Sequence, residues 1–301
     1  MGSYPQMKTS LVIGASGFIG NILFHKLESK ARYGTCFNYM QDQFSILDIT
    51  NDRETSLFCE KVAPDIIYNL GALPNVEWAE ENIQECRCVN VNAVKNLVQA
   101  ANLSAAKLVH FSTDYIFDGL AGPYSEDASP NPVNIYGQAK LDAENYIKEN
   151  CHDWLIIRVT VVYGWESRGK NFISALIDKL SNKQTMKIPI DQIGSPTFAD
   201  NMLDIVVHLA ENDFTGVYNV SGDEVMDRFT FAKIAAEVFE LDSSLLLPVL
   251  TEELGQRAKR PLNAGFILNK VKRDVPILLM NPAQGLLHMK EHLPNYPRIT
   301  K

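Results

Sequence analysis

The stretch LVIGASGFIG, residues 11–20, joins an apolar run to three glycines that are each separated by two residues. The apolar run predicts a strand, and an apolar stripe of helical period from Phe18 to Leu27 predicts a helix directly after it. Glycines at such a junction allow a tight turn, close approach of a phosphate and close packing of the helix. The pattern predicts that a dinucleotide pyrophosphate binds at the helix N-terminus, with a turn that serves packing alone as the alternative.

Further apolar runs typical of strands recur in the first half of the chain, and helical stretches separate several of them. The runs lie at residues 10–13, 33–37, 65–70, 107–111 and 154–159. Strands that alternate with helices pair in parallel, so we predict an α/β fold with a Rossmann-type doubly wound parallel sheet. The alternation loosens past about residue 165. We therefore expect a dinucleotide-binding domain at 6–165 and a smaller, partly interleaved substrate lobe at 166–301.

The composition is that of a globular protein, with 301 residues of which 46% are hydrophobic and 21% charged. A net charge of −8 argues against a nucleic acid or an anionic membrane as the main partner, because both favour a basic surface. Five cysteines without a C-x-x-C pair indicate reduced thiols and a cytoplasmic protein. No segment reaches the roughly 18 uninterrupted apolar residues of a membrane span.

The second predicted strand bears on the choice of cofactor. NAD-specific sites usually carry Asp or Glu at the end of this strand, but here the strand reads YGTCFNYM and Asn38 stands nearest that place, with Arg32 just before the strand. Without a carboxylate there is no repulsion of a 2′-phosphate, so we expect NADP(H) in preference to NAD(H). Asp48 is either an adenine contact or the cap of the next helix.

Polar residues follow the strand at 107–111 in the stretch FSTDYIFDG, residues 111–119. Such residues face the ligand crevice of an open α/β sheet, although Ser, Thr and Asp are also common in turns and caps. In the stretch NIYGQAK, Tyr136 and Lys140 are four residues apart and so share one helix face. An ammonium beside a phenol favours its ionised form, which suits general acid catalysis, and the Thr113 hydroxyl could polarise the same carbonyl. An ordinary surface pair is the alternative for an isolated Y-x-x-x-K.

The motifs GASGFIG, STDYIFDG, YGQAK and RVTVVYG together resemble the extended short-chain dehydrogenase/reductases, and within them the dTDP-4-dehydrorhamnose reductase family. The resemblance implies NADPH-dependent reduction of the 4-keto group of a nucleoside-diphosphate deoxysugar, most simply dTDP-4-dehydro-L-rhamnose, as in dTDP-rhamnose biosynthesis. The regulatory beta subunit of methionine adenosyltransferase has a similar sequence, which makes a nucleotide-binding regulatory subunit the first alternative. A sugar-nucleotide epimerase is the second. No metal is expected, and a homodimer is possible.

The resemblance also implies the site residues. The catalytic set would be Thr113, Tyr136 and Lys140. Residues expected at the cofactor are Gly14, Ser16, Gly17, Phe18, Ile19, Gly20, Asn38, Asp48, Ile49, Leu70, Gly71, Ala72, Asn90, Tyr136 and Lys140. The resemblance places Asp114 and Tyr115 beside the sugar. Independently of it, Arg257 and Arg260 belong to a tight basic cluster before Pro261 and are expected to bind the substrate diphosphate, with a solvated loop as the alternative.

Two departures from the family pattern fall where the substrate should lie. Val161 stands where the family commonly has a tryptophan, and Pro74 replaces a threonine. These changes bear on the identity of the sugar more than on hydride transfer. His288 and His292 have the i, i+4 spacing of metal ligands, but without a third ligand a solvated helix face is the better interpretation.

Overall fold

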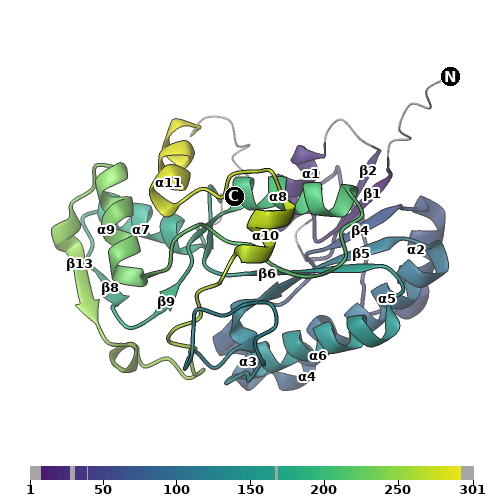
Figure 1. Ribbon diagram of the computed structural model, residues 1–301, viewed down its shortest axis with the longest axis horizontal. Helices are drawn as coiled ribbons and strands as arrows, with labels where there is room; N and C mark the ends of the chain where they lie inside the picture. Colours follow the sequence, from purple (N-terminus) through teal and green to yellow (C-terminus); the bar gives the residue numbers. More distant parts are fainter. Residues whose placement is uncertain (1–7, 28–30, 39, 167–168, 293–301) are drawn as a thin grey trace. The chain divides into compact units, whose positions relative to one another are not determined.

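The computed structural model of the protein describes residues 8–27, 31–38, 40–166 and 169–292. Its main sheet has seven strands in the order β11-β6-β5-β4-β1-β2-β3 (Figure 1). The strands are β1 (Ser10–Ile13), β2 (Arg32–Cys36), β3 (Ser45–Ile46), β4 (Ile66–Asn69), β5 (Lys107–Thr113), β6 (Trp154–Val159) and β11 (Gly216–Asn219). The pairs from β3 through β2, β1 and β4 to β5 are parallel. This order, in which the chain reverses its direction of travel after the third strand, confirms the predicted Rossmann-type sheet.

The chain divides into two compact units. The first comprises Met1–Thr113, Asn134–Arg158 and Val206–Tyr218, and the second comprises Asp114–Val133, Val159–Ile205 and Asn219–Lys301. Each unit is thus built from three segments of the chain. The assignment of cofactor binding to 6–165 and of substrate binding to 166–301 stays a prediction, and residues 6, 7 and 293–301 of it lie outside the described residues.

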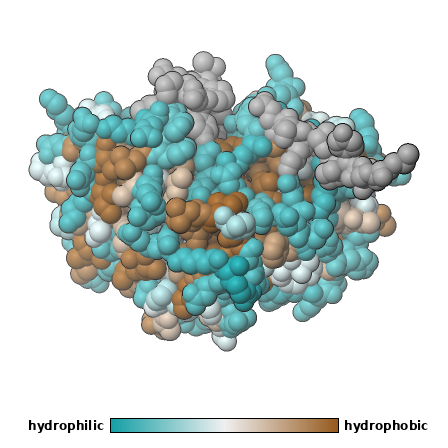
Figure 2. All heavy atoms as spheres, turned by 45° about the horizontal axis from the view of Figure 1, so that its top comes forward, coloured by the Kyte–Doolittle hydropathy of each residue, from teal (hydrophilic) through white to brown (hydrophobic). Residues whose placement is uncertain are grey.

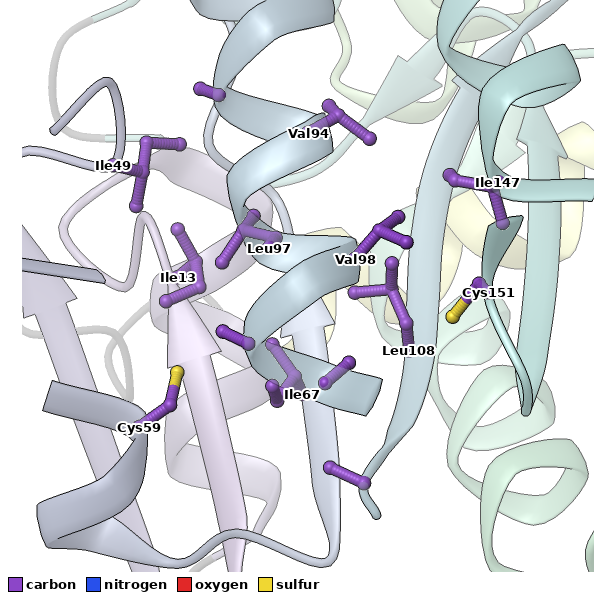
Figure 3. Close-up of a cluster of buried hydrophobic side chains, with 14 of the residues drawn as sticks. Ile13, Ile49, Cys59, Ile67, Val94, Leu97, Val98, Leu108, Ile147 and Cys151 are labelled. Atoms are coloured by element: carbon purple, nitrogen blue, oxygen red, sulfur yellow. The ribbon is translucent and has the colours of Figure 1, made fainter. Parts of the chain in front are cut away.

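The core of the first unit lies between the sheet and three helices, α2 (Asp52–Val62), α5 (Ala93–Ser104) and α6 (Ile135–Asn150). Figure 3 shows Val94, Leu97 and Val98 of α5 directed toward the sheet, where they meet apolar side chains of β1, β4 and β5. Helical spacing of these α5 residues produces the apolar stripe, and alternation along each strand supplies its partner. Successive strand residues point to opposite faces, and α1 (Phe18–Lys26) packs against β1 and β2 on the other side (Figure 1).

A smaller cluster in the same unit surrounds the start of α6. It contains Ala79 of α3 (Val76–Glu81), Cys86 of α4 (Ile83–Arg87) and Val91 of the π-helical turn η1 (Cys88–Asn92). Tyr136 is partly buried against this cluster. The local packing therefore fixes the first turn of α6, on which the tyrosine stands.

The second unit has its own aromatic-rich core, formed mainly by α7 (Phe172–Ser181), α9 (Arg228–Val238) and α11 (Pro282–Glu291). The same unit also contains three two-stranded sheets. They are β8 (Met186–Pro189) with β13 (Leu246–Val249), β9 (Ile193–Gly194) with β12 (Met226–Asp227), and β7 (Val162–Tyr163) with β10 (Thr197–Phe198). The remaining elements are η2 (Asp114–Ile116), η3 (Ser243–Leu245), η4 (Thr251–Leu254), α10 (Asn269–Asp274) and α8 (Ala199–Glu211), the last of which runs from the second unit into the first.

The surface is mixed. Figure 2 shows hydrophobic side chains interspersed among hydrophilic ones on the face that it presents. No helix in the described part of the chain combines the length and the apolar character that a membrane crossing requires. All five cysteines are free thiols.

Candidate active site

The loop between β1 and α1 can be built only with glycine at two points. Gly14 has a positive φ of 75°, and a Cβ there would lie 3.1 Å from the backbone of Leu70 and Gly71. A Cβ on Gly20 would lie 2.2 Å from the carbonyl oxygen of Gly14, so the first turn of α1 sits directly on the loop. The predicted roles of these glycines in turning the chain and in helix packing are consistent with this geometry.

The N-terminus of α1 has features that suit an anion. Its N-cap is Gly17, which has no side chain to cap the helix, and its first turn carries no acidic residue. The first backbone N–H groups of a helix lack partners within the helix, and the helix dipole adds positive potential there. A phosphate at this place would accept those hydrogen bonds, so the loop fits a dinucleotide pyrophosphate. The predicted residues Ser16, Phe18 and Ile19 lie in or beside this turn.

The end of β2 carries Asn38 in place of an acidic residue, and the Arg32 side chain packs on the end of α1. Asn38 is exposed just after the strand. The guanidinium of Arg32 instead donates to the carbonyl oxygens of Phe24 and His25, 2.5 and 3.2 Å away, and lies over the Phe24 ring. Arg32 thus stabilises the C-terminal end of α1, where a cation is favoured by the helix dipole.

The loop before α2 settles one alternative for Asp48. The helix is capped by Asn51, whose side chain accepts a hydrogen bond from the Glu54 N–H. Asp48 accepts from the N–H and the hydroxyl of Thr50, so the interpretation of Asp48 as the helix cap is wrong. Asn96 of α5 donates to the carbonyls of Ile49 and Thr50 and holds this loop, a role that the sequence analysis missed.

The loop after β4 carries Leu70, Gly71 and Ala72, all expected at the cofactor. Asn69, the last residue of β4, accepts a hydrogen bond from the Gly71 N–H at 3.1 Å. Asn90 of η1 is almost fully buried and bonds both the N–H and the carbonyl of Leu73. The Asn90 side chain therefore orders the loop through its backbone.

Thr113 and Lys140 are brought to the same end of β5. Thr113 is the last residue of the strand and is buried, and the Lys140 amine of α6 donates to the carbonyl oxygen of Phe111 at 2.6 Å. Asn134 caps α6 by accepting from the Gly137 N–H, which places Tyr136 in the first turn. One helix therefore presents the phenol and the amine, and the amine is fixed to the strand that ends in the threonine.

Burial changes the acid–base properties of these groups. Lys140 is 3% exposed, and the loss of hydration lowers its pKa from the ordinary 10.5 to about 8, despite the opposing charge of Glu144. The amine also lies 3.0 Å from Nε2 of His110, whose pKa is held well below its ordinary value by burial and by the nearby lysine. Burial would raise the pKa of Glu144, but its bidentate pair with Arg158 lowers it, so Glu144 is ionised. Neither His110 nor Glu144 belongs to a motif that the sequence analysis recognised.

The second unit holds the residues expected at the substrate. Asp114 accepts a hydrogen bond from the Thr160 hydroxyl at 2.7 Å, and Val161, next to Thr160, has a strained positive φ of 45°. The guanidinium of Arg260 lies over the Tyr115 ring and donates to its hydroxyl at 3.2 Å. Arg257 is exposed on the preceding loop.

Arg228, the first residue of α9, joins this group and was missed. Its guanidinium lies over the Phe172 ring and its charge interacts with Tyr115, Asp114 and Arg260. Loss of hydration lowers the pKa of Arg228, and the Arg260 charge acts in the same direction, whereas Tyr115 and Asp114 oppose the shift. Within the described residues it forms no ion pair. Two guanidinium groups near one tyrosine make a local positive site in an acidic protein.

Of the two histidines considered as metal ligands, His288 lies on α11 and His292 is its C-cap, and their ring centroids are stacked 4.1 Å apart. Among the described residues no group of three or more His, Cys, Asp or Glu side chains could hold a metal ion.

Comparison with protein families gives a match over almost the whole chain. Residues 7–293 match the family described as the RmlD substrate binding domain. The chain belongs to this family.

Relatives within the family carry two different names. A dTDP-4-dehydrorhamnose reductase of Burkholderia thailandensis is 32% identical, over 84% of this chain and 88% of its own. The methionine adenosyltransferase 2 subunit beta of Xenopus laevis is 28% identical, over 88% of this chain and 82% of its own. A crystal structure of the dTDP-4-dehydrorhamnose reductase of Bacillus anthracis in complex with NADP is 29% identical with a TM-score of 0.88, covering 95% of this chain and 100% of that one. The relatives of this chain thus include proteins named as reductases and proteins named as a subunit of another enzyme.

Proposed function

We propose that the protein is an NADPH-dependent reductase of the 4-keto group of a nucleoside-diphosphate deoxysugar, with dTDP-4-dehydro-L-rhamnose as the first substrate to test. The observation that carries the proposal is the fixed placement of the Lys140 amine at the end of β5. Lys140 shares a helix face with Tyr136, and its amine is bonded to the carbonyl oxygen of Phe111, two residues before Thr113. An ordinary surface pair would leave the amine in water, whereas here it is buried. Reductases named for this reaction are among the relatives of similar length.

The residues around the glycine loop fit an NADP(H) molecule. The uncapped start of α1 would bind the pyrophosphate, and Asn38 stands where NAD-specific proteins carry an acid. The relative from Bacillus anthracis was solved with NADP. NADPH, when bound, supplies the hydride for the reduction, and NAD(H) is the alternative to be compared.

The catalytic residues have distinct roles in this proposal. The hydroxyl of Thr113 donates a hydrogen bond to the sugar carbonyl oxygen and so polarises it. As the carbon receives hydride, the oxygen becomes an alkoxide and takes a proton from the phenol of Tyr136. Lys140, when protonated, stabilises the resulting phenolate by its charge. The proposed reaction thus consumes one hydride and one proton for each alcohol formed.

Substrate binding is assigned to the second unit. Arg228 and Arg260 provide guanidinium groups for the diphosphate, since forked N–H donors match phosphate oxygens. Asp114 and Tyr115 are assigned to the sugar. Val161, in place of a family tryptophan, leaves the identity of the sugar as the least constrained part of the proposal.

The direct test measures NADPH oxidation with 4-keto sugar nucleotides generated in situ, each with dTDP and UDP as the nucleotide. Oxidation that requires the keto sugar, with the alcohol identified as product, supports the proposal. NADPH binding without oxidation across the panel would overturn it.

A regulatory subunit is the second candidate, because the Xenopus laevis relative with that name covers as much of the chain as the reductases do. This candidate predicts co-purification with a methionine adenosyltransferase and a change in that enzyme's kinetics. A measurable reductase turnover would favour the first candidate, since a purely regulatory protein has no need of it.

We further propose a cytoplasmic protein that forms a homodimer. Five free thiols support a reducing compartment, where disulfides are rare. Sedimentation of the purified protein tests the dimer, and fractionation of cells tests the compartment.

A further inference from the structure

A continuous set of hydrogen bonds connects the loop after β4 to the buried lysine. The Gly71 N–H donates to Oδ1 of Asn69, and Nδ2 of Asn69 lies 3.0 Å from Nδ1 of His110. On the other side of the ring, Nε2 lies 3.0 Å from the Lys140 amine. Asn69, His110 and Lys140 are 1%, 1% and 3% exposed, so water does not compete for these bonds.

The orientation of the Asn69 amide decides which nitrogen of His110 carries hydrogen. Because Oδ1 accepts from Gly71, the NH₂ group faces the histidine and donates to Nδ1. A neutral imidazole then has its hydrogen on Nε2, and this N–H points to the lysine. An N–H can donate to Lys140 only if the lysine presents a lone pair, which an ammonium does not have. The hydrogen bonds from Gly71 through Asn69 to His110 therefore favour the uncharged form of the Lys140 amine.

The ammonium form needs the opposite arrangement. Nε2 must then accept from Lys140, the hydrogen must move to Nδ1, and the Asn69 amide must turn its oxygen toward the ring. That turn breaks the bond from Gly71, whose backbone lies against Gly14 of the glycine loop. Protonation of the lysine is in this way coupled to a loop expected at the cofactor.

Few charges face the lysine from the elements around it. Glu144, one turn further along α6, favours the ammonium but is shared with Arg158 and Lys148. Cys86 of α4 also interacts with it, and burial raises the pKa of that thiol. The titratable group of β5 that contacts the amine is His110, and Asn69 of β4 is uncharged. The histidine and the asparagine are thus the polar side chains in this chain of bonds to the amine.

We propose that His110 and Asn69 are positioning residues of the reductase: they hold the Lys140 amine against β5 and determine when it carries a proton, and so when it can assist Tyr136. The inference rests on the proposed reductase function for its role in turnover. The hydrogen-bond network itself does not depend on that function. Loss of the network changes the charge on Lys140 without removing any group that contacts the reacting atoms.

Two substitutions remove the preference for the uncharged amine in different ways. Asn69→Asp keeps an acceptor for the Gly71 N–H and offers a second oxygen to Nδ1–H of His110, which turns Nε2 into an acceptor for the ammonium. His110→Phe keeps an aromatic ring but removes both nitrogens, so the uncharged Lys140 amine loses the N–H donor that favours it. Tyr68→Phe is the matched control, since Tyr68 precedes Asn69 on β4, is fully buried and has a hydroxyl without a hydrogen-bond partner in the described structure.

The experiment titrates Lys140 directly. The full-length protein is labelled at the lysine ε-carbon, the Lys140 resonance is assigned by its loss in Lys140→Met, and its shift is followed against pH by NMR. We expect the Lys140 midpoint to rise by about one pH unit or more in Asn69→Asp, to rise also in His110→Phe and to stay unchanged in Tyr68→Phe. The acid–base midpoint in the pH profile of kcat should move in the same directions.

A merely structural role would leave the Lys140 midpoint where it is. A folded Asn69→Asp protein whose midpoint stays within about half a pH unit of the wild type overturns the proposal. If Asn69→Asp does not fold, the His110→Phe protein is titrated in its place, and a Lys140 midpoint that does not rise in it overturns the proposal. The NMR titration needs no turnover, so a protein inactive on sugar nucleotides would refute the reductase function while the titration still tests the network.

Discussion

The amine of Lys140 lies 2.6 Å from the carbonyl oxygen of Phe111, two residues before Thr113 on β5. This bond fixes the middle of α6 to the strand end and keeps a normally hydrated group almost fully buried. The resulting loss of hydration lowers the pKa of Lys140 to about 8, although Glu144 and Cys86 act to raise it.

The depressed pKa predicts how stability changes with pH. Between the pKa of about 8 in the folded protein and 10.5 in the unfolded chain, the unfolded chain binds more protons, so the free energy of unfolding rises with pH. The rise amounts to about 3 kcal/mol for this residue. Urea unfolding of wild type and Lys140→Met at pH 7 to 10.5 should show the wild type gaining relative to the variant as pH increases. A constant difference would mean that Lys140 is not desolvated in the folded state.

Removing the Tyr136 hydroxyl should abolish proton delivery without disturbing the fold. Tyr136→Phe keeps the ring that packs with Ala79 and Cys86, so the melting temperature should change little. We expect kcat for keto-sugar reduction to fall by about 10² to 10⁴, the range that a general acid contributes, with NADPH affinity within a few-fold of wild type. Tyr146→Phe on the same helix is the control and should keep full activity. Undiminished reduction by Tyr136→Phe would contradict the assigned role.

The fold and the placement of Tyr136 and Lys140 on one helix could be predicted from the sequence because both depend on local patterns. Apolar runs and glycines mark strands and turns, and Y-x-x-x-K spacing places two side chains on one helix face. His110, Asn69 and Arg228 could not be found in this way, since their roles depend on partners 30 or more residues distant: His110 meets Asn69 and Lys140, 41 and 30 positions away.

The glycine loop should respond to added carbon atoms according to the space available. A Cβ on Gly20 would come within 2.2 Å of the Gly14 carbonyl oxygen, whereas one on Gly17 would lie 3.1 Å from the same atom. Gly20→Ala must therefore displace α1 from the loop, and we expect a loss of NADPH affinity of tenfold or more together with a lower melting temperature. Gly17→Ala should have a weaker effect on both. Fluorescence titration with NADPH and thermal unfolding measure the two quantities, and equal behaviour of the variants would contradict the packing argument.

Replacing Arg228 should separate substrate binding from stability. Its partly buried guanidinium lies over the Phe172 ring and forms no ion pair in the described part of the chain, so Arg228→Met keeps most of the apolar contact and should change the melting temperature little. If the arginine binds the diphosphate, losing charge-assisted hydrogen bonds worth about 1.5 to 3 kcal/mol should raise KM for the sugar nucleotide roughly ten- to hundredfold. NADPH affinity should not change. Arg273→Met, at an exposed arginine paired with Asp274 on α10, is the control for loss of one positive charge and should leave KM unaltered. A destabilised Arg228→Met protein with normal KM would instead assign Arg228 to the packing of α9 against α7. A residue kept for substrate binding often lowers the stability of the unliganded protein, whereas a packing residue raises it.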